Sequence, residues 1–315
     1  MTAIIILNWN GADDTVACLR SLENAQGSFF VIVADNGSAD DSIARIKEYA
    51  CSSALEIKIL ELGHNYGFAG GNNRAVKYAS QYSPDSYLLL NNDTEVTSDF
   101  LIRLEEFRKT DSRYQVLTPR INYYYDKERI WNCGGVVRFG MRRYLYAGAH
   151  ESSVSGRKPF RITFVTGCTL YFIPSVIYDG FTPFTERFFF GEEDFDFSLR
   201  MKKRGVRMAC VTDSVIYHKV SAAGDSMIRS GKVYLHLLNR YIDIKSKYSR
   251  LFFMVWRLVY HHSTIKNLVK AFGASRAKEI YKHLLYDVRV KDGVTEDDFN
   301  RLVISDSYWK DGNES

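Results

Sequence analysis

Residues 188–200, with the sequence FFFGEEDFDFSLR, place four carboxylates where they could act as a base or bind a cation. The apolar residues among and after them have helical spacing, so the acids fall in the first turn of a helix, where the helix dipole stabilises negative charge. Most carboxylates at such positions only cap the helix, and this is the simpler interpretation. The four acids are Glu192, Glu193, Asp194 and Asp196.

A second acidic site favours a catalytic interpretation. The sequence Asn-Asn-Asp at 91–93 follows the strand-like run 87–90. The chain therefore has one carboxylate just after a strand, in addition to the four at the predicted helix start. Such a pair suits a reaction that needs both a metal ion and a base. Asp93 supplies only one carboxylate, so the phosphates of a bound nucleotide would have to supply further ligands to a cation. His218 follows the strand-like run 214–217 and could add a nitrogen ligand that favours Mn²⁺ over Mg²⁺, although a lone histidine after a strand is usually structural.

The composition is that of a globular protein with one large domain or two smaller ones. The chain has 315 residues, of which 46% are hydrophobic and 25% are charged. Its five cysteines are scattered and never spaced as Cys-x-x-Cys, which argues against a disulfide framework or a zinc site and for a reducing compartment. The strand-like start lacks the leader of a signal peptide, and no run approaches the ~18–20 apolar residues of a membrane span. We therefore expect a cytoplasmic protein.

The net charge of +5 is unevenly distributed. Residues 226–291 contain 14 Lys/Arg and three acidic residues, a local charge of +11 that leaves −6 for the rest of the chain. A basic tail on an acidic body suggests an anionic partner for the tail. The tail also holds the apolar runs 251–256 and 258–260, which are too short to cross a bilayer. Either they pack on the rest of the chain or on a second subunit as a homodimer, or they lie in an anionic membrane surface with their aromatic face toward the acyl chains.

Strand-like and helix-like segments alternate through the first hundred residues. This pattern predicts an α/β fold with a mainly parallel sheet between helices and right-handed crossovers. The predicted strands are 3–7, 29–34, 55–61 and 87–90, and the predicted helices are 13–24, 42–49, 70–82 and 99–108.

The regularity weakens after residue 99, where strand-like segments stand between long loops. This part should form a mixed rather than a parallel sheet, and the chain becomes helical from residue 225 onward. The strand-like segments are 115–118, 135–139, 164–173 and 207–211. The predicted domains are 1–222, composed of a nucleotide-binding half (1–98) and a catalytic, acceptor-side half (99–222), and a helical, basic C-terminal region (223–315).

Ligands of parallel α/β sheets bind beyond the carboxyl ends of the strands, near a topological switch point. Four strand ends in this chain are rich in Asn, Asp and Gly: residues 8–10, 35–38, 63–67 and 91–93. In any one loop such residues only make turns, but four on one edge indicate the rim of a nucleotide pocket. The candidate donor-binding residues are Asn8, Asn10, Asp35, Asn36, Asn65, Gly67, Gly70, Gly71, Asn72 and Asn92.

Two of these loops suggest particular contacts. Asp35 could accept hydrogen bonds from a base imide or a ribose hydroxyl, since both present donors. The segment 67–73, GFAGGNN, places three glycines ahead of a helix that we expect to begin near Asn72, so backbone N–H groups there could approach a diphosphate. The glycine spacing matches neither a dinucleotide fingerprint nor a phosphate-binding loop with Lys-Ser/Thr.

An ordered set of motifs resembles the family 2 glycosyltransferases, and within them the bacterial rhamnosyltransferase-type members that build surface polysaccharides. The motifs are NWNG (8–11), DNGSADDS (35–42), NYGFAGGNN (65–73), LLLNNDTEV (88–96), GEEDFDFSLRMKKRG (191–205) and His218, and they cover roughly residues 1–222. The resemblance implies a GT-A fold, a dTDP- or UDP-sugar donor, dependence on Mn²⁺ or Mg²⁺ and an inverting single displacement. It also implies a lipid-linked saccharide acceptor, and hence a site on the inner face of the cell membrane.

The resemblance assigns roles to several residues. Asp35 matches the family's base- or ribose-binding acid, and Asp93 matches the last acid of its D-x-D metal motif. His218 matches a late ligand of the metal or the diphosphate. Asn91 stands where the motif has its first acid, so the identity of the metal stays open.

Asp194, the second member of the pair Glu193-Asp194, matches the family's catalytic base. A sugar hydroxyl is far too weak an acid to attack at neutral pH unless a carboxylate accepts its proton. We expect Phe188–Phe190 and Phe195 to surround Asp194, to desolvate it and so to make it more basic. The segment Thr166-Gly167-Cys168 and Trp131 are placed on the acceptor side, where aromatic rings commonly contact sugars.

Other functional classes share parts of this pattern. A sugar nucleotidyltransferase would need a basic residue in the loop after the first strand, and residues 8–14 contain none. A non-catalytic nucleotide-sugar-binding protein would have no reason to keep both Asp93 and Asp194. Nucleic-acid binding through the basic tail is disfavoured because the rest of the chain is acidic.

Overall fold

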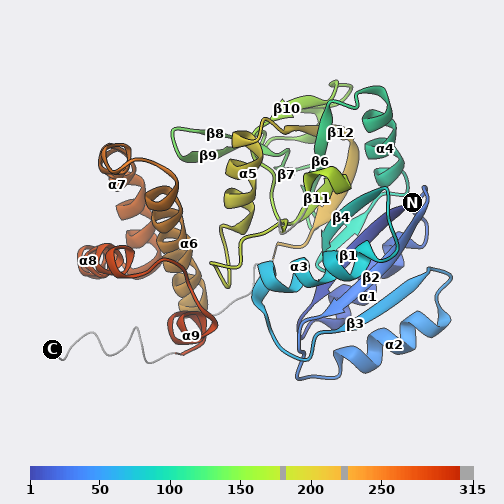
Figure 1. The fold of residues 1–315 in the computed structure, drawn as a ribbon, viewed down its shortest axis with the longest axis horizontal. Helices are drawn as coiled ribbons and strands as arrows, with labels where there is room; N and C mark the ends of the chain where they lie inside the picture. Colours follow the sequence, from blue (N-terminus) through green and yellow to red (C-terminus); the bar gives the residue numbers. More distant parts are fainter. Residues whose placement is uncertain (178–181, 221–225, 306–315) are drawn as a thin grey trace. The chain divides into compact units, whose positions relative to one another are not determined.

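The computed structural model describes residues 1–177, 182–220 and 226–305, which form two compact units (Figure 1). The first unit contains Met1–Phe184 and Asp194–Val220. The second contains Thr185–Glu193 and the chain from residue 221 onward. The boundary predicted near residue 222 lies among residues 221–225, outside the described residues.

The first unit is built on a sheet whose four N-terminal strands are parallel, as the alternating pattern predicts. Along the sheet the strand order is β10-β12-β6-β11-β4-β1-β2-β3. The parallel strands are β1 (Thr2–Asn8), β2 (Phe29–Asp35), β3 (Ile57–Glu61) and β4 (Ser86–Asn91). They alternate along the chain with α1 (Ala12–Leu22), α2 (Ser42–Ser52), α3 (Gly67–Ser80) and, after β4, α4 (Phe100–Thr110).

The other side of the sheet is mixed, which confirms the predicted change of character after residue 99. Strand β11 runs antiparallel to β4 and β6, whereas β6 and β12 are parallel. The longer strands are β6 (Tyr114–Tyr123), β11 (Thr169–Phe172) and β12 (Arg207–His218). The strands that the pattern does not predict are β5 (Thr94–Val96), β7 (Ile130–Asn132) and β10 (Phe160–Ile162), and the hairpin of β8 (Gly135–Arg138) and β9 (Met141–Tyr144) stands apart from the large sheet.

Helices cover both faces of the sheet because buried side chains of β1 alternate between two cores. Ala3 and Ile5 belong to one hydrophobic cluster and Ile4 and Ile6 to the other. Helices α3 and α5 (Glu193–Lys203) contribute to the first cluster, and α1, α2 and α4 contribute to the second. The result is the three-layer arrangement that a buried parallel sheet requires (Figure 1).

The strand order creates a topological switch point beside β1. From β1 the chain proceeds to β2 and β3 on one side, and then returns to β4 on the other side. The carboxyl ends of β1 and β4 therefore lie at the switch point, where open α/β sheets bind their ligands. Asn8 ends β1 and Asn91 ends β4, so the predicted loops lie at this edge.

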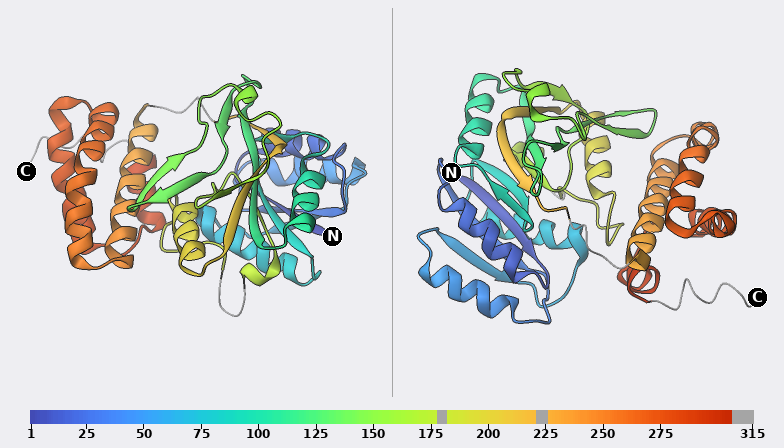
Figure 2. Two further views of the ribbon diagram at one scale, coloured as in Figure 1. Left: turned by 90° about the horizontal axis from the view of Figure 1, so that it is seen from above. Right: turned by 180° about the vertical axis from the view of Figure 1, so that it is seen from behind.

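The described part of the second unit is mainly helical. Helices α6 (Ser226–Lys247), α7 (Arg250–Phe272) and α8 (Ala274–Val290) lie side by side (Figure 2). A short α9 (Glu296–Phe299) continues into a π-helical turn at Asn300–Ile304. Among the described residues no helix is long and apolar enough to cross a membrane.

The aromatic residues of α7 point into this unit. Trp256 is fully buried, and its ring lies 5.0 Å from that of Tyr241 on α6 and 4.7 Å from that of Tyr260. The prediction of an outward aromatic face is therefore wrong, because the large rings are used in packing. Aliphatic side chains occupy the exposed side instead, led by Leu251 and Leu258.

Candidate active site

The ends of β1 and β2 are joined by a buried polar network around Asp35. This carboxylate accepts hydrogen bonds from Asn8 Nδ2 at 2.8 Å, from Ser38 Oγ at 2.6 Å and from the Ser38 N–H at 3.0 Å. Asn8 in turn accepts from the Thr15 hydroxyl at 2.7 Å, and Asn10 Oδ1 accepts from the Ala39 N–H at 2.9 Å. Asp35 thus uses three of about four acceptor sites to fix the loop.

The loop before α3 is organised by two asparagines. Asn36 donates to Asn65 Oδ1 at 2.8 Å and accepts from the Tyr66 N–H at 3.1 Å. Asn65 Oδ1 also accepts from the Gly67 N–H at 2.9 Å. Asn36 and Asn65 therefore satisfy two of the backbone N–H groups that the first turn of the helix leaves unpaired.

Helix α3 begins at Gly67, earlier than the predicted start near Asn72. Gly70 and Gly71 consequently lie inside the helix, where their N–H groups belong to the helical ladder and are not presented to a diphosphate. Gly71 has a packing role, because a Cβ there would lie 2.7 Å from Leu7 Cδ1. Asn72 Nδ2 donates back to the Phe68 carbonyl at 2.9 Å.

The loop after β4 is held against α1 and β12. Asn92 Nδ2 donates to Thr15 Oγ1 at 3.1 Å, so the side chain faces α1. The Asp93 carbonyl accepts from the Lys219 N–H at 2.9 Å, and the Asp93 carboxylate lies 3.1 Å from His218 Nε2. The structure thus brings together the two residues that the sequence predicts as metal ligands.

His218 lies in a largely buried environment between a carboxylate, a thiol and an indole. Burial disfavours the charged imidazolium, but Cys168 and Asp93 outweigh it and raise the pKa of His218 above its ordinary value. Burial raises the pKa of the Cys168 thiol. The Trp131 ring meets the imidazole edge-on at 4.6 Å, so this tryptophan orients His218.

The Asp93–His218 pair fits a divalent cation. Two ligands bound at about 2.1 Å in perpendicular directions lie about 3 Å apart, close to the observed separation of carboxylate oxygen and imidazole nitrogen. An oxygen and a nitrogen ligand together suit a cation such as Mn²⁺, which on binding would displace the proton that the raised pKa favours on His218. Within the described ranges no group of three or more His, Cys, Asp or Glu side chains is arranged to hold a metal. Further ligands would therefore come from the phosphates of the donor.

Asp194 lies on the first turn of α5 and is engaged from two sides. Its Oδ2 accepts from the Gly167 N–H at 3.2 Å, and its Oδ1 lies 3.5 Å from Arg142 Nη1. The side chain is 13% exposed, so the carboxylate is largely buried beside a guanidinium. Phe195 is fully buried, whereas Phe188–Phe190 belong to the other compact unit.

The remaining acids of the cluster have different surroundings. Glu192 forms a buried ion pair with Arg240, and Asp196 pairs with Arg200 one turn along α5. Glu193 is 8% exposed and begins α5. Three of the four carboxylates thus face an arginine. Asp194 is the one that also contacts the segment before β11, through the Gly167 N–H.

Sequence reasoning did not find Arg142, and it named Cys168 only as an acceptor-side residue, not as a neighbour of His218. Arg142 lies in β9, whose sequence Met-Arg-Arg-Tyr marks only a polar, short strand. Cys168 Sγ contacts His218, and the Cys168 carbonyl accepts from the Asn91 N–H at 2.9 Å. A cysteine two residues after Thr166 carries no sequence signal for such a contact.

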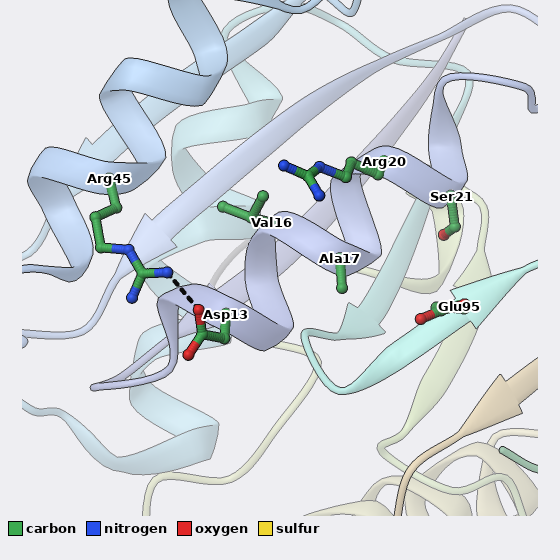
Figure 3. A pocket seen from close by; sticks show the side chains of 7 residues that line it. All are labelled: Asp13, Val16, Ala17, Arg20, Ser21, Arg45 and Glu95. Atoms are coloured by element: carbon green, nitrogen blue, oxygen red, sulfur yellow. Dashed lines mark hydrogen bonds and ion pairs between the residues drawn. The ribbon is translucent and has the colours of Figure 1, made fainter. Parts of the chain in front are cut away.

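A separate pocket of about 440 Å³ lies along the outer side of α1 (Figure 3). Its polar wall includes Arg20, Glu95 and an ion pair between Arg45 and Asp13. None of the predicted donor, metal or base residues lines it. This pocket is therefore distinct from the candidate active site.

Comparison with known proteins identifies the family. Residues 3–173, more than half of the chain, match the sequence profile of "Glycosyl transferase family 2". The chain belongs to this family.

One curated relative and two solved structures are similar to this glycosyltransferase. The low-salt glycan biosynthesis hexosyltransferase Agl10 of Haloferax volcanii is 28% identical over 120 residues, which cover 38% of this chain and 36% of the relative. The mannosyltransferase PcManGT from Pyrobaculum calidifontis, solved with GDP-Man and Mn²⁺, has a TM-score of 0.57 at 12% identity and covers 90% of this chain and 75% of its own. GalNAc-T7, solved with UDP, GalNAc and Mn²⁺, has a TM-score of 0.60 at 13% identity and covers 98% of this chain and 56% of its own.

These likenesses establish the fold of the glycosyltransferase. The predicted GT-A fold, a mixed α/β architecture with a mostly parallel central sheet and additional C-terminal helices, is confirmed.

Proposed function

We propose that this glycosyltransferase is metal-dependent and inverting, and that it moves rhamnose or a similar hexose from a dTDP- or UDP-sugar to a saccharide hydroxyl. The observation that carries the proposal is the connection between two sites. Asp194 accepts from the N–H of Gly167, and the next residue, Cys168, contacts His218, which pairs with Asp93. A base and a cation site are thus linked through two consecutive residues.

In the proposed mechanism Asp194 accepts the proton of the attacking hydroxyl. Gly167 and Arg142 keep its carboxylate oriented, and the carboxylate form is the one that can accept a proton. Asp93 and His218 would hold the cation, which when bound would neutralise the charge of the departing diphosphate. Asn8, Ser38 and Asp35 stiffen the edge of the sheet against which the nucleotide would lie.

An inverting reaction is favoured by the surroundings of the acidic cluster. A retaining double displacement would require a second carboxylate as nucleophile. Glu192 and Asp196 are buried in ion pairs with arginines, so within the cluster only Glu193 could take that role beside Asp194. A single displacement needs only Asp194.

The similar proteins support the kind of donor and cation. PcManGT was solved with GDP-Man and Mn²⁺, and GalNAc-T7 was solved with UDP, GalNAc and Mn²⁺. The name of Agl10 refers to glycan biosynthesis, which supports a growing glycan as the acceptor. We propose a lipid-linked polysaccharide intermediate at the cytoplasmic face of the membrane, with the enzyme peripherally bound.

The proposal is tested by a thermal-shift screen of dTDP-, UDP- and GDP-sugars with Mn²⁺, followed by NMR of the product's anomeric configuration. We expect one class of nucleotide sugar to raise the unfolding temperature only when Mn²⁺ is present. The product should have the opposite anomeric configuration to the donor. Stabilisation by none of the donors, or retention of configuration, would contradict the proposal.

A further inference from the structure

Helix α7 has two apolar faces. Trp256 and Leu268 are buried within the helical unit. Leu251, Met254 and Leu258, which are 67%, 51% and 73% exposed, lie on the other side of the helix. Together with Val255 and Val259 they define the α7 face, in which positions 251, 254, 255 and 258 have the i, i+3, i+4, i+7 spacing of one helical stripe.

The charges on the same helix are all positive. In its 23 residues, Arg250–Phe272, α7 has no Asp or Glu. Its cations are Arg250, Arg257, Lys266 and Lys270, and His261 and His262 lie among them. An exposed apolar stripe on a helix without carboxylates fits a partner that is both apolar and anionic.

We propose that the α7 face binds the surface of a bilayer that contains anionic lipid. The aliphatic side chains would enter the boundary between headgroups and acyl chains, and the lysines and arginines would contact the headgroups. A second copy of the chain is a less suitable occupant, because a two-fold contact through this face would bring two positively charged helices together. The helix would lie in the plane of the membrane surface.

This inference deepens the proposed function, since the lipid-linked acceptor would be in the same bilayer. It depends on the α7 face alone and not on the catalytic residues. The protein could therefore fail to bind vesicles and still transfer sugar, or bind vesicles and show no transfer.

The experiment is co-sedimentation of the full chain with vesicles. We expect binding to equal mixtures of phosphatidylcholine and phosphatidylglycerol, weaker binding at high salt, and little binding to phosphatidylcholine alone. The double variant Leu251→Ser/Leu258→Ser should lose at least about tenfold in affinity for the anionic vesicles. Its fold should be unchanged, since both side chains are mostly exposed.

The matched control is Tyr286→Ser/Val290→Ser on α8, whose side chains are 65% and 57% exposed. This control should bind anionic vesicles like the parent protein. The rate of donor hydrolysis should be unchanged in both double variants. This result would show that membrane binding and the proposed chemistry use different residues. Equal binding to neutral vesicles, no binding to either kind, or full binding by the α7 variant would overturn the inference. So would a dimer that dissociates in the α7 variant, because the face would then belong to a second copy.

Discussion

The carboxylate of Asp194 accepts a hydrogen bond from the backbone N–H of Gly167 at 3.2 Å. Gly167 directly precedes Cys168, which contacts His218 and whose carbonyl accepts from the N–H of Asn91. The proposed base and the proposed cation site therefore share one short segment before β11. Displacement of this segment would disturb both.

Replacement of Asp194 should separate chemistry from binding. Asp194→Asn keeps the size and one acceptor oxygen but cannot take up the proton, so transfer should fall at least ~10²-fold while the dissociation constant for donor nucleotide stays near normal. Steady-state kinetics and calorimetry check this. Asp196→Asn is the matched control, because its partner is Arg200 on the same helix, and it should lower stability more than turnover per folded molecule. A larger loss of turnover in Glu193→Gln than in Asp194→Asn would assign the base to Glu193.

Arg142 should act by positioning Asp194. Arg142→Ala removes the cation 3.5 Å from the Asp194 carboxylate, and we expect transfer to fall about tenfold with the donor's dissociation constant little changed. Arg142→Lys should restore part of the rate. The neighbouring Arg143→Ala alters an exposed residue of the same hairpin and serves as the control. Equal rates for the Arg142 and Arg143 alanine variants would remove Arg142 from the mechanism.

The ion pair between Glu192 and Arg240 should stabilise the helical unit. Both side chains are at most 5% exposed, so Arg240→Ala would leave a buried carboxylate without its guanidinium, at a cost of about 3–5 kcal/mol. Chemical denaturation followed by circular dichroism measures this free energy of unfolding. The double variant Glu192→Gln/Arg240→Met should recover much of the loss.

Arg301→Ala provides the comparison for this pair, because its partner Asp298 is shared with Lys291 and its own side chain is 51% exposed. It should cost less than about 1 kcal/mol. Similar losses of unfolding free energy in Arg240→Ala and Arg301→Ala would contradict a stabilising role of the Glu192–Arg240 ion pair.

The stability of the C-terminal helices should depend on pH through Asp298. Burial opposes ionisation of this carboxyl, but Lys291 and the capping residue Thr295 outweigh it and lower its pKa. A lowered folded-state pKa stabilises the protein above the unfolded value of about 3.9, and this contribution is lost as the pH falls through the folded value. Asp298→Asn should therefore cost about 1 kcal/mol near neutral pH, the usual effect of a helix cap. The free energies of unfolding of the two proteins should converge as the pH falls through the folded-state pKa of Asp298, and a constant difference at all pH values would contradict the assignment.

The sequence predicts the parallel half of the fold well because each strand there is a continuous apolar run that ends in polar residues. It misplaces the start of α3 because glycines at 70 and 71 disfavour a helix. The close approach of Leu7, visible only in the fold, explains the glycine at 71. The sequence does not show which side of α7 is buried, because apolar residues lie on both sides of this helix. The buried side is the one that packs against Tyr241 on α6.

Within the acidic cluster, sequence order alone cannot distinguish four neighbouring carboxylates. Their roles depend on partners elsewhere in the chain, such as Arg240 for Glu192 and Gly167 for Asp194. The pairing of Asp93 with His218, in contrast, follows from two residues at strand ends that both reach one edge of the sheet.

The most direct test of the proposed chemistry measures release of nucleoside diphosphate from the preferred nucleotide sugar, with Mn²⁺, by the parent protein and by Asp93→Asn. We predict release by the parent protein that is abolished by excess EDTA, and none by Asp93→Asn, although the variant remains folded by circular dichroism. Asp93 lies 3.1 Å from His218, so His218→Ala should release diphosphate more slowly than the parent but faster than Asp93→Asn. Full release in excess EDTA, or undiminished release by Asp93→Asn, would contradict metal-dependent transfer at this site.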